Sequence, residues 1–360
     1  MTNLVEAAAQ LSKRTPSVES AVQAAAKAGL EFDPVGSMDK ATIIIGACFY
    51  GFTFLVLLYA FINRNYAPIR AKNVKLTAMV YTGAVLWFVG DIATNGHVEM
   101  VGVWSKCKVW CLWFRVFFAY TFSAAVGIRA YGLYRVFVLH RPYRGVGFYA
   151  PIIGLFTGLL IFCITSQLIP DEKTVMYVEE LEMCTYVWGF RGACLGLLWL
   201  IWLFVFYFVF KIRNIHSSFN ERWESIICCT LALGIDLFTT LMHTINPHYP
   251  LTLRYRVANT FFDFCMGNMV TLVMIIYPVV QCMFNRDEYK RKWLAKLQAD
   301  GLRKEYKVSS GNPTTSRNYS VMNEEEGDST FQKNTAFWGG QSMVIDDSNA
   351  NYNFESRRVL

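Results

Sequence analysis

The chain is poor in charged residues, and this absence excludes most soluble folds. Only 17% of its 360 residues are Asp, Glu, Lys or Arg, whereas about a quarter is usual for soluble domains. Hydrophobic residues make up 54% and aromatic residues 16%, and the mean hydropathy is +0.28. The composition predicts an integral membrane protein. The net charge of +7 is therefore interpreted by its position along the chain, and no nucleic-acid partner is expected.

The start of the chain lacks a basic cluster followed by an apolar run, which excludes a cleavable signal peptide. We expect residues 1–40 to form an extracellular N-terminal tail, in which the alanine-rich residues 4–29 form either a weak helix or a disordered segment. The ten cysteines do not indicate a disulfide scaffold, because most of them fall inside apolar runs.

Long apolar segments dominate the rest of the chain. A membrane-spanning helix needs about 20 mostly apolar residues, and seven segments meet this requirement. The sequence therefore predicts an all-α membrane protein with a seven-helix bundle over residues 41–284. The second and sixth segments each carry an aspartate, so six is the alternative count. The predicted spans are 41–63, 76–95, 108–134, 147–169, 187–210, 226–246 and 257–284.

The orientation follows from the lysines and arginines between the spans, which are more frequent on the cytoplasmic side. Segments 64–75, 135–144, 211–225 and 285–296 together hold 15 of them. The alternate segments 21–40, 95–108, 169–186 and 247–256 hold 7. We therefore expect a multi-pass protein of the plasma membrane with its N-terminus outside and its C-terminus in the cytoplasm.

Two further regions follow the seventh span. Residues 285–303 place Tyr289, Trp293, Leu294 and Leu297 on one face among basic residues, which is typical of an amphipathic helix lying on membrane lipid. A solvated charged helix is the alternative. Residues 304–360 are rich in Ser, Asn, Thr and Glu, and their composition predicts a disordered cytoplasmic tail. Cys282 is either a palmitoylation site or a buried thiol.

Several ionisable residues lie inside the predicted spans, where charge is costly and usually functional. At 1.5 Å per residue, they all fall in the outer half of the bundle. One hypothesis is an outward-open cavity for a small ligand, with Arg115 as its anchor. The other is a structural ion pair of Arg115 with Asp263 or Asp91. The candidate ligand-binding residues are Asp91, Arg115, Arg191, His243 and Asp263, with Trp110, Trp113 and Phe117 as aromatic walls.

The seven spans, the outside N-terminus and the basic helix after the last span resemble the architecture of G-protein-coupled receptors. The third span ends in IRAYGLYRVFVLHRPYRG, which is similar to a divergent Asp-Arg-Tyr signature without its acid. The seventh ends in YPVVQCMF, with Tyr277 and Pro278 in the place of the Asn-Pro-x-x-Tyr region. The resemblance implies a disulfide between Cys107 and Cys184. It implies a G-protein-facing set of Arg129, Tyr134, Arg135 and Arg141.

Within that superfamily, three motifs look closest to fungal seven-helix receptors. They are YAPIRAKNVKLT, W-x-x-C-x-x-W-x-x-W and R-x-Y-x-L-Y-R, and the similarity covers about residues 40–300. Related receptors carry a fused regulator-of-G-protein-signalling domain. The 57 residues after Arg303 are too few and too polar to form that domain here.

The resemblance implies a receptor that senses a small extracellular ligand and signals through the α subunit of a heterotrimeric G protein. The basic segments 129–144 and 211–222 would meet that subunit. It implies no catalytic residue, no metal and no cofactor. The alternatives are a small-solute transporter and an intramembrane metal hydrolase built on His97, His243, His248, Asp91 and Asp236. Residues 257–284 contain no lysine, which excludes a retinal protein.

Overall fold

The computed structural model describes residues 18–27, 29–139, 145–179, 181–212 and 221–299, and three short strands beyond them. Within this part of the chain, seven helices are long and apolar enough to cross a membrane, as the sequence predicts. Some helices start before the predicted spans, because polar residues such as Asp39 and Glu224 extend them past their apolar parts. The helices are α3 Ser37–Ile62, α5 Val74–Thr94, η1 Lys108–Phe117 continued by α6 Phe118–Leu133, α7 Val146–Leu168, α8 Trp188–Lys211, α9 Glu221–Ile245 and α10 Leu253–Phe284.

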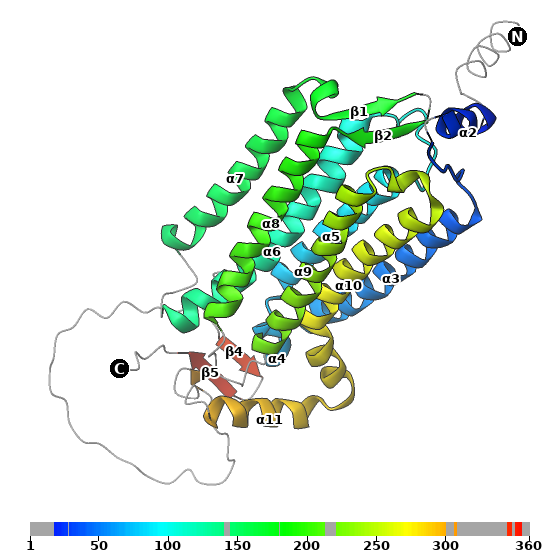
Figure 1. Cartoon of the computed structure of the whole chain (residues 1–360). Helices are drawn as coiled ribbons and strands as arrows, with labels where there is room; N and C mark the ends of the chain where they lie inside the picture. The colour runs from blue at the N-terminus through cyan, green and yellow to red at the C-terminus, as the bar shows by residue number, and fades with distance from the viewer. Residues whose placement is uncertain are drawn as a thin grey trace, which may run out of the picture.

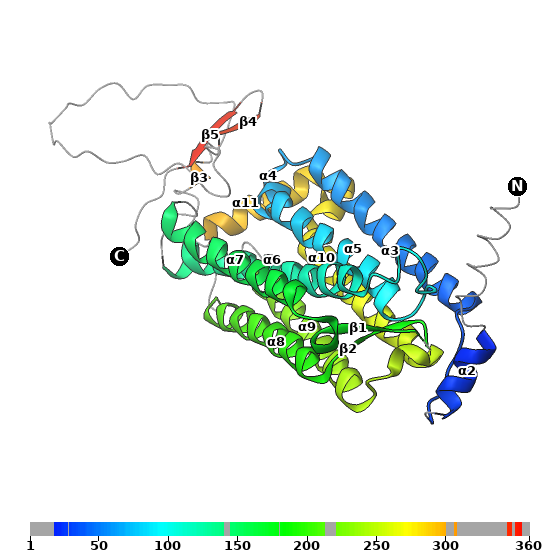
Figure 2. The same ribbon diagram turned by 90° about the horizontal axis from the view of Figure 1, so that it is seen from above.

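Short elements distinguish the two ends of the bundle (Figure 1). At one end, here called the hairpin end, strands β1 Val175–Val178 and β2 Met183–Tyr186 pair antiparallel. The opposite end, called the α11 end, carries α11 Arg286–Ala299. Helices α2 and α11 lie at opposite ends in both views (Figures 1 and 2). The hairpin end also holds α2 Val18–Lys27, η3 Asp171–Lys173 and η5 Tyr249–Leu251, and the α11 end holds α4 Ala67–Ala71 and η2 Tyr134–Val138.

The two terminal regions are described only in part. Of the predicted N-terminal tail, α2 falls within the alanine-rich segment, but residues 37–40 already belong to the first membrane helix. Beyond α11, the structure describes β3 Tyr306–Lys307, β4 Val344–Asp347 and β5 Ala350–Phe354, in an antiparallel sheet of order β3-β5-β4. The rest of the predicted disordered tail and Arg141 lie outside the described residues.

The sequence predicts that one face of α11 lies on membrane lipid, whereas the structure packs residues of that face on the bundle. Trp293 is buried, and Tyr289 and Leu294 are half-buried. The ring of Tyr289 meets Tyr277 of α10 at 5.5 Å between centroids. Leu297 belongs to the helix, but its side chain lies outside the described part. Cys282 is buried and its sulfur lies 3.9 Å from the Tyr59 hydroxyl, so it is a core thiol in this structure.

The interior of the bundle is asymmetric. Helices α6 and α10 are the most buried of the seven, whereas α7 lies at the edge and is the least buried (Figure 1). The largest core lies between α5, α6, α8, α9 and α10 and includes Phe122, Trp202, Phe264 and Val270. Because lipid tails are as apolar as the core, this packing is driven by close contact rather than by escape from water.

Gly90 marks the closest approach of two of these helices. A Cβ atom at Gly90 of α5 would lie 2.5 Å from the Arg115 backbone nitrogen and 2.6 Å from the Phe114 carbonyl carbon. Both atoms belong to the backbone of η1 and cannot rotate away. Only a residue without a side chain permits this contact, which brings α5 against the segment that carries Arg115.

Replacing Gly90 by alanine is therefore expected to destabilise the bundle by on the order of 1–3 kcal/mol or more, as overpacking does. This outweighs the gain of about 1 kcal/mol from alanine's higher helix propensity. The measurement is the apparent melting temperature of the detergent-purified chain. The matched control is Gly51→Ala in α3, where nothing lies within 4 Å of the added Cβ. Equal melting temperatures for the two variants would contradict the close-contact role.

Candidate functional site

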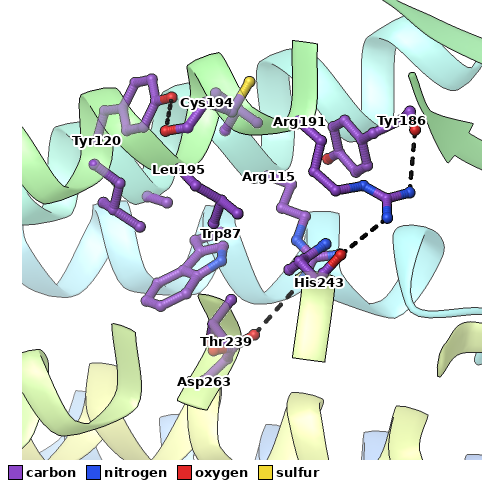
Figure 3. Close-up of a pocket in the computed structure, with 13 residues that line it drawn as sticks. Trp87, Arg115, Tyr120, Tyr186, Arg191, Cys194, Leu195, Thr239, His243 and Asp263 are labelled. Atoms are coloured by element: carbon purple, nitrogen blue, oxygen red, sulfur yellow. Dashed lines mark hydrogen bonds and ion pairs between the residues drawn. The ribbon is translucent and has the colours of Figure 1, made fainter. Parts of the chain in front are cut away.

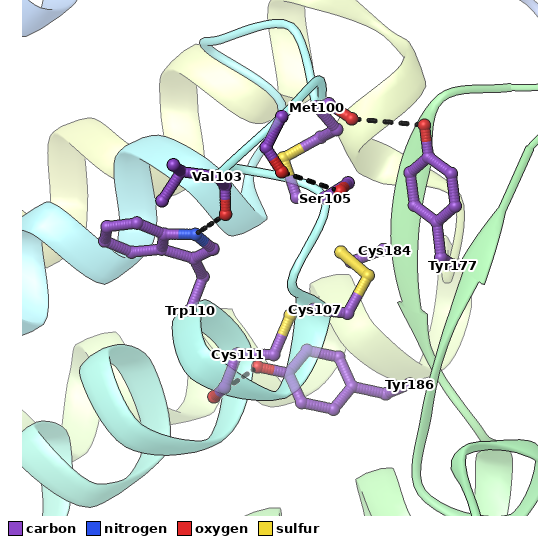
Figure 4. The surroundings of a disulfide bond; sticks show 10 residues. Met100, Val103, Ser105, Cys107, Trp110, Cys111, Tyr177, Cys184 and Tyr186 are labelled. Atoms are coloured by element: carbon purple, nitrogen blue, oxygen red, sulfur yellow. Dashed lines mark hydrogen bonds between the residues drawn. A yellow bond between two sulfur atoms is a disulfide. The ribbon is translucent and has the colours of Figure 1, made fainter. Parts of the chain in front are cut away.

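The segment that carries Arg115 is fixed at its start by a disulfide. Cys107 immediately precedes η1 and is bonded to Cys184 of β2, 77 residues further along, with 5.4 Å between the Cα atoms. The Tyr186 hydroxyl donates to the Cys111 carbonyl at 3.0 Å, which holds β2 over the same turn (Figure 4). Cys111 itself is a fully buried free thiol. The η1 segment is a π-helix, an irregularity often found at functional sites.

Arg115 is buried and fully engaged by neighbouring oxygens. Its Nε lies 3.0 Å from Asp91 Oδ1, and its Nη2 lies 3.9 Å from Asp263 Oδ2. Its Nη1 donates to Thr94 Oγ1 at 2.8 Å and to Asn95 Oδ1 at 2.6 Å. The structural ion pair considered from the sequence is thus present, with both candidate carboxylates on one guanidinium.

Polar contacts continue from Arg115 toward the hairpin end. Asn95 Nδ2 donates to Thr260 Oγ1 at 2.7 Å, and His97 Nε2 lies 2.8 Å from the same hydroxyl. The Tyr249 hydroxyl donates to Asn95 Oδ1 at 2.7 Å. Burial raises the pKa of Tyr249 to about 12, although Arg115 acts in the opposite direction. The hydroxyl therefore keeps its proton at neutral pH and remains a donor.

The same chain of contacts reaches the segment before α3. His97 Nδ1 lies 2.8 Å from Asp39 Oδ1, and Arg256 binds both oxygens of Asp39 at 2.8 and 2.7 Å. Arg256 Nη1 also donates to the Asp33 carbonyl at 2.6 Å and Nη2 to the Pro34 carbonyl at 3.1 Å. The sequence did not indicate this cluster, because Asp39 lies just before the predicted first span and Arg256 just before the predicted seventh.

A cavity of about 70 Å³ lies within the bundle on the hairpin side of its core (Figure 3). Of the predicted ligand-binding residues, Arg115, Arg191, His243 and Asp263 line it, while Asp91 is the ion-pair partner of Arg115. The structure thus brings together residues from η1, α8, α9 and α10 that lie far apart in the sequence. Further lining residues are Trp87, Val116, Ala119, Tyr120, Tyr186, Cys194, Leu195, Leu198 and Thr239.

The aromatic walls of the cavity come from residues that the sequence did not indicate. Trp87, Tyr120 and Tyr186 line it. Among the predicted walls, Trp113 donates its ring N–H to Gln167 Oε1 of α7 at 3.1 Å and packs against Phe117. Trp110 stacks on Trp104 at 4.4 Å. Trp113 and Arg115 are two residues apart, so their side chains point about 160° apart at 3.6 residues per turn, and Arg115 lines the cavity whereas Trp113 meets α7.

Several polar atoms around the cavity are buried without a hydrogen-bond partner among the described residues. They are Nε of Arg191, Nδ1 of His243 and Oδ1 of Asp263. Buried polar groups are nearly always hydrogen-bonded, and leaving one unsatisfied costs about 1–3 kcal/mol. Water or a ligand in the cavity could satisfy all three, so the arrangement suits the binding of a small polar molecule.

A second charged cluster lies at the α11 end. Glu224 of α9 accepts from Lys72 Nζ at 2.7 and 2.8 Å, and its Oε2 lies 3.5 Å from Arg129 Nη2. Arg129 also donates to the Lys72 carbonyl at 3.3 Å. The sequence lacks the acid next to Arg129 that the receptor signature carries. The structure supplies a carboxylate from another helix, so α6, α9 and the segment after α4 are joined by a buried ion-pair cluster.

The other predicted G-protein-facing residues pack on neighbouring helices. Arg135 is buried, donates to the Tyr131 hydroxyl at 3.2 Å and to the Gly147 carbonyl, and lies over the Phe148 ring. Tyr134 packs against Phe208 at 5.6 Å. These contacts fix the end of α6 against α7 and α8.

The histidines considered for a metal hydrolase lie apart. His97 belongs to the Asp39 cluster, whereas His243 lines the cavity and meets the Tyr249 ring. In the described part of the chain, no three His, Cys, Asp or Glu side chains are placed to share a metal ion. The geometry of the site thus gives no support to the hydrolase alternative.

Fold and site together define a multi-pass membrane protein with seven spanning helices and a polar cavity inside the bundle. Residues 36–279 match the family model described as "7 transmembrane sweet-taste receptor of 3 GCPR". The match covers more than half of the chain, which therefore belongs to this family of seven-helix receptors. A comparison with curated proteins gives no match. Membership of a receptor family argues for a non-enzymatic role.

Proposed function

We propose that this protein is a G-protein-coupled receptor of the plasma membrane that senses a small extracellular ligand. One observation carries the proposal: within a receptor-family bundle, Arg115, Arg191, His243 and Asp263 converge on one cavity and leave polar atoms unsatisfied. A buried, partly apolar cavity with a few convergent polar groups is the usual form of a ligand site. The proposed function requires no catalytic residue, metal or cofactor.

In the proposed orientation, the hairpin end faces the outside and the α11 end faces the cytoplasm. The excess of Lys and Arg in the segments at the α11 end supports this assignment. The Cys107–Cys184 disulfide at the hairpin end is consistent with it, because disulfides persist in oxidising compartments. The cavity then lies on the extracellular side of the bundle core, and α11 lies at the inner leaflet.

The proposed mechanism is a population shift between two arrangements of the α11 end. In the resting arrangement, Glu224 holds α9 to Arg129 of α6 and to Lys72. Ligand binding favours an arrangement in which α9 moves away from α6 and this cluster separates. The released basic groups, together with the segments 129–144 and 211–222, then bind the α subunit of a heterotrimeric G protein. Arg129, Tyr134, Arg135 and Arg141 are the residues proposed to face it.

We also propose, on the sequence motifs alone, that the protein is close to the fungal seven-helix receptors related to those fused to a regulator-of-G-protein-signalling domain. One of these motifs, YAPIRAKNVKLT, contains Lys72 of the Glu224 cluster. The motif thus includes a residue that forms one of the ion pairs proposed to hold the resting arrangement.

Guanine nucleotide exchange tests the proposed function. The full chain, incorporated in lipid nanodiscs, is mixed with purified candidate α subunits, and nucleotide uptake is compared with that seen with empty nanodiscs. Because a population shift leaves a fraction of the chain in the active arrangement even without ligand, we expect faster exchange with at least one α subunit. The absence of acceleration with every α subunit would instead favour the transporter alternative.

A further inference from the structure

The two arginines of the cavity differ in how their charge is balanced. Arg115 faces the carboxylates of Asp91 and Asp263 at 3.0 and 3.9 Å. Arg191 is 7% exposed, and among the described residues it donates only to main-chain carbonyls, from Nη1 to His243 at 3.1 Å and from Nη2 to Tyr186 at 3.1 Å (Figure 3). No carboxylate of the described residues forms an ion pair with it. A buried cation without a counter-ion is unfavourable.

Arg191 also retains a free donor. Its Nε is buried and has no hydrogen-bond partner in the described part of the chain. His243 Nδ1, on the same cavity wall, is likewise unpaired. The rest of the wall is largely apolar or aromatic, with Trp87, Tyr120 and Leu198 among its members. A molecule beside Arg191 therefore meets a positive charge that no carboxylate of the described residues pairs, next to a largely apolar wall.

We propose that the ligand of this cavity is a small organic carboxylate with an apolar body, and that Arg191 binds its carboxylate. The inference rests on the proposed ligand-sensing function and specifies the chemical class that the site accepts. Its anion preference comes from Arg191 and not from Arg115, which already faces two carboxylates. A charge-assisted hydrogen bond between guanidinium and carboxylate is among the stronger polar contacts in proteins.

The size of the cavity limits that body. A volume of 70 Å³ is about half that of the roughly 150 Å³ cavity that holds benzene, so the site suits an aliphatic chain of a few carbons, and a probe with a ring tests a larger body. The competing possibility is a cation held by the free Oδ1 of Asp263. It is the weaker one, because Asp263 already faces Arg115 and accepts from Asn259 Nδ2 at 3.0 Å.

Probes of similar size but different charge distinguish an anion bound by Arg191 from a cation bound by Asp263. The detergent-purified full chain is titrated with butyrate, butyramide and butylamine, and separately with phenylacetate, phenylacetamide and phenethylamine. The readout is the shift in apparent melting temperature, which rises with ligand concentration when the folded state binds the probe. We expect one of the carboxylates to bind at least tenfold more tightly than its amide and amine. Equal binding within a set, tighter binding of the amine, or no binding by either carboxylate would overturn the proposal.

Substitutions then test whether Arg191 is the residue that binds the carboxylate. Arg191→Gln is expected to weaken carboxylate binding about ten- to one-hundredfold and to leave amide binding within twofold. The control Arg254→Gln removes an exposed charge at the start of α10 and should change neither. Carboxylate binding by Arg191→Gln as tight as the original chain's would contradict the assignment. If that variant does not fold, Arg191→Lys keeps the charge, and the comparison of probes on the unaltered chain still decides.

These titrations involve no G protein, so their outcome is separate from that of the exchange assay. If the chain accelerates exchange on an α subunit but shows no preference for the carboxylate probes, only the proposed ligand class is overturned. A carboxylate preference without exchange on any α subunit would leave the binding site standing and overturn the G-protein receptor.

Discussion

An Arg115→Ala chain is expected to lose on the order of 3–5 kcal/mol of stability, the usual effect of removing one partner of a buried ion pair. The substitution leaves Asp91 and Asp263, 0% and 2% exposed, without their shared cation. It also removes the donor to Thr94 and Asn95. The measurements are the apparent melting temperature and the fraction of the chain that reaches the plasma membrane.

Two further variants separate the structural role of Arg115 from ligand contact. Arg115→Lys keeps the charge without the forked geometry and should lose less stability. The double variant Asp91→Asn with Arg115→Gln removes both charges of the closest pair, and we expect it to be more stable than the sum of the single changes predicts. Wild-type stability of Arg115→Ala would contradict the structural role. A folded Arg115→Ala chain that responds normally to an agonist would exclude ligand contact by Arg115.

Glu224→Gln is expected to produce the second large effect, on signalling rather than on ligand binding. Glutamine has nearly the same shape but cannot form ion pairs with Lys72 and Arg129, so the arrangement with α9 apart from α6 gains population. Each 1.4 kcal/mol of such a shift changes the population ratio tenfold. We expect several-fold more of the variant to be retained by an immobilised, nucleotide-free α subunit.

The chain offers a matched control for this substitution. Glu288 of α11 also forms an ion pair, with Lys292 at 2.6 Å, but both side chains are largely exposed. Exposed pairs of this kind contribute little, so Glu288→Gln should leave retention unchanged. Equal retention of the two variants would show that the cluster at Glu224 does not restrain α9.

The sequence predicted the bundle well because each spanning helix is recognisable from its own residues. Apolar runs of about 20 residues gave all seven helices. The errors lie at helix starts, where Asp39, Glu224 and Arg256 continue a helix with polar side chains. These residues are buried only because their partners come from distant segments, as Arg256 does for Asp39. No local pattern could show that they belong inside.

The site was predicted in part for the same reason. Ionisable residues in apolar runs are conspicuous, so Arg115, Arg191, His243 and Asp263 were found and do meet at one cavity. Which side each tryptophan faces depends on the turn of the helix. Trp113 lies two residues from Arg115, which places the two side chains about 160° apart even in a regular α-helix, and Trp113 accordingly meets Gln167 of α7. The role of Glu224 required knowing which helices are neighbours.

Guanine nucleotide exchange by the Glu224→Gln chain tests the receptor assignment most directly, because its cluster at the α11 end is already broken and no ligand is needed. The chain is placed in lipid nanodiscs with each candidate α subunit, beside the unaltered chain and Glu288→Gln. We expect Glu224→Gln to accelerate exchange on at least one α subunit several-fold more than the unaltered chain and Glu288→Gln do. Exchange no faster than with empty nanodiscs, for every α subunit and for all three chains, would contradict the receptor assignment.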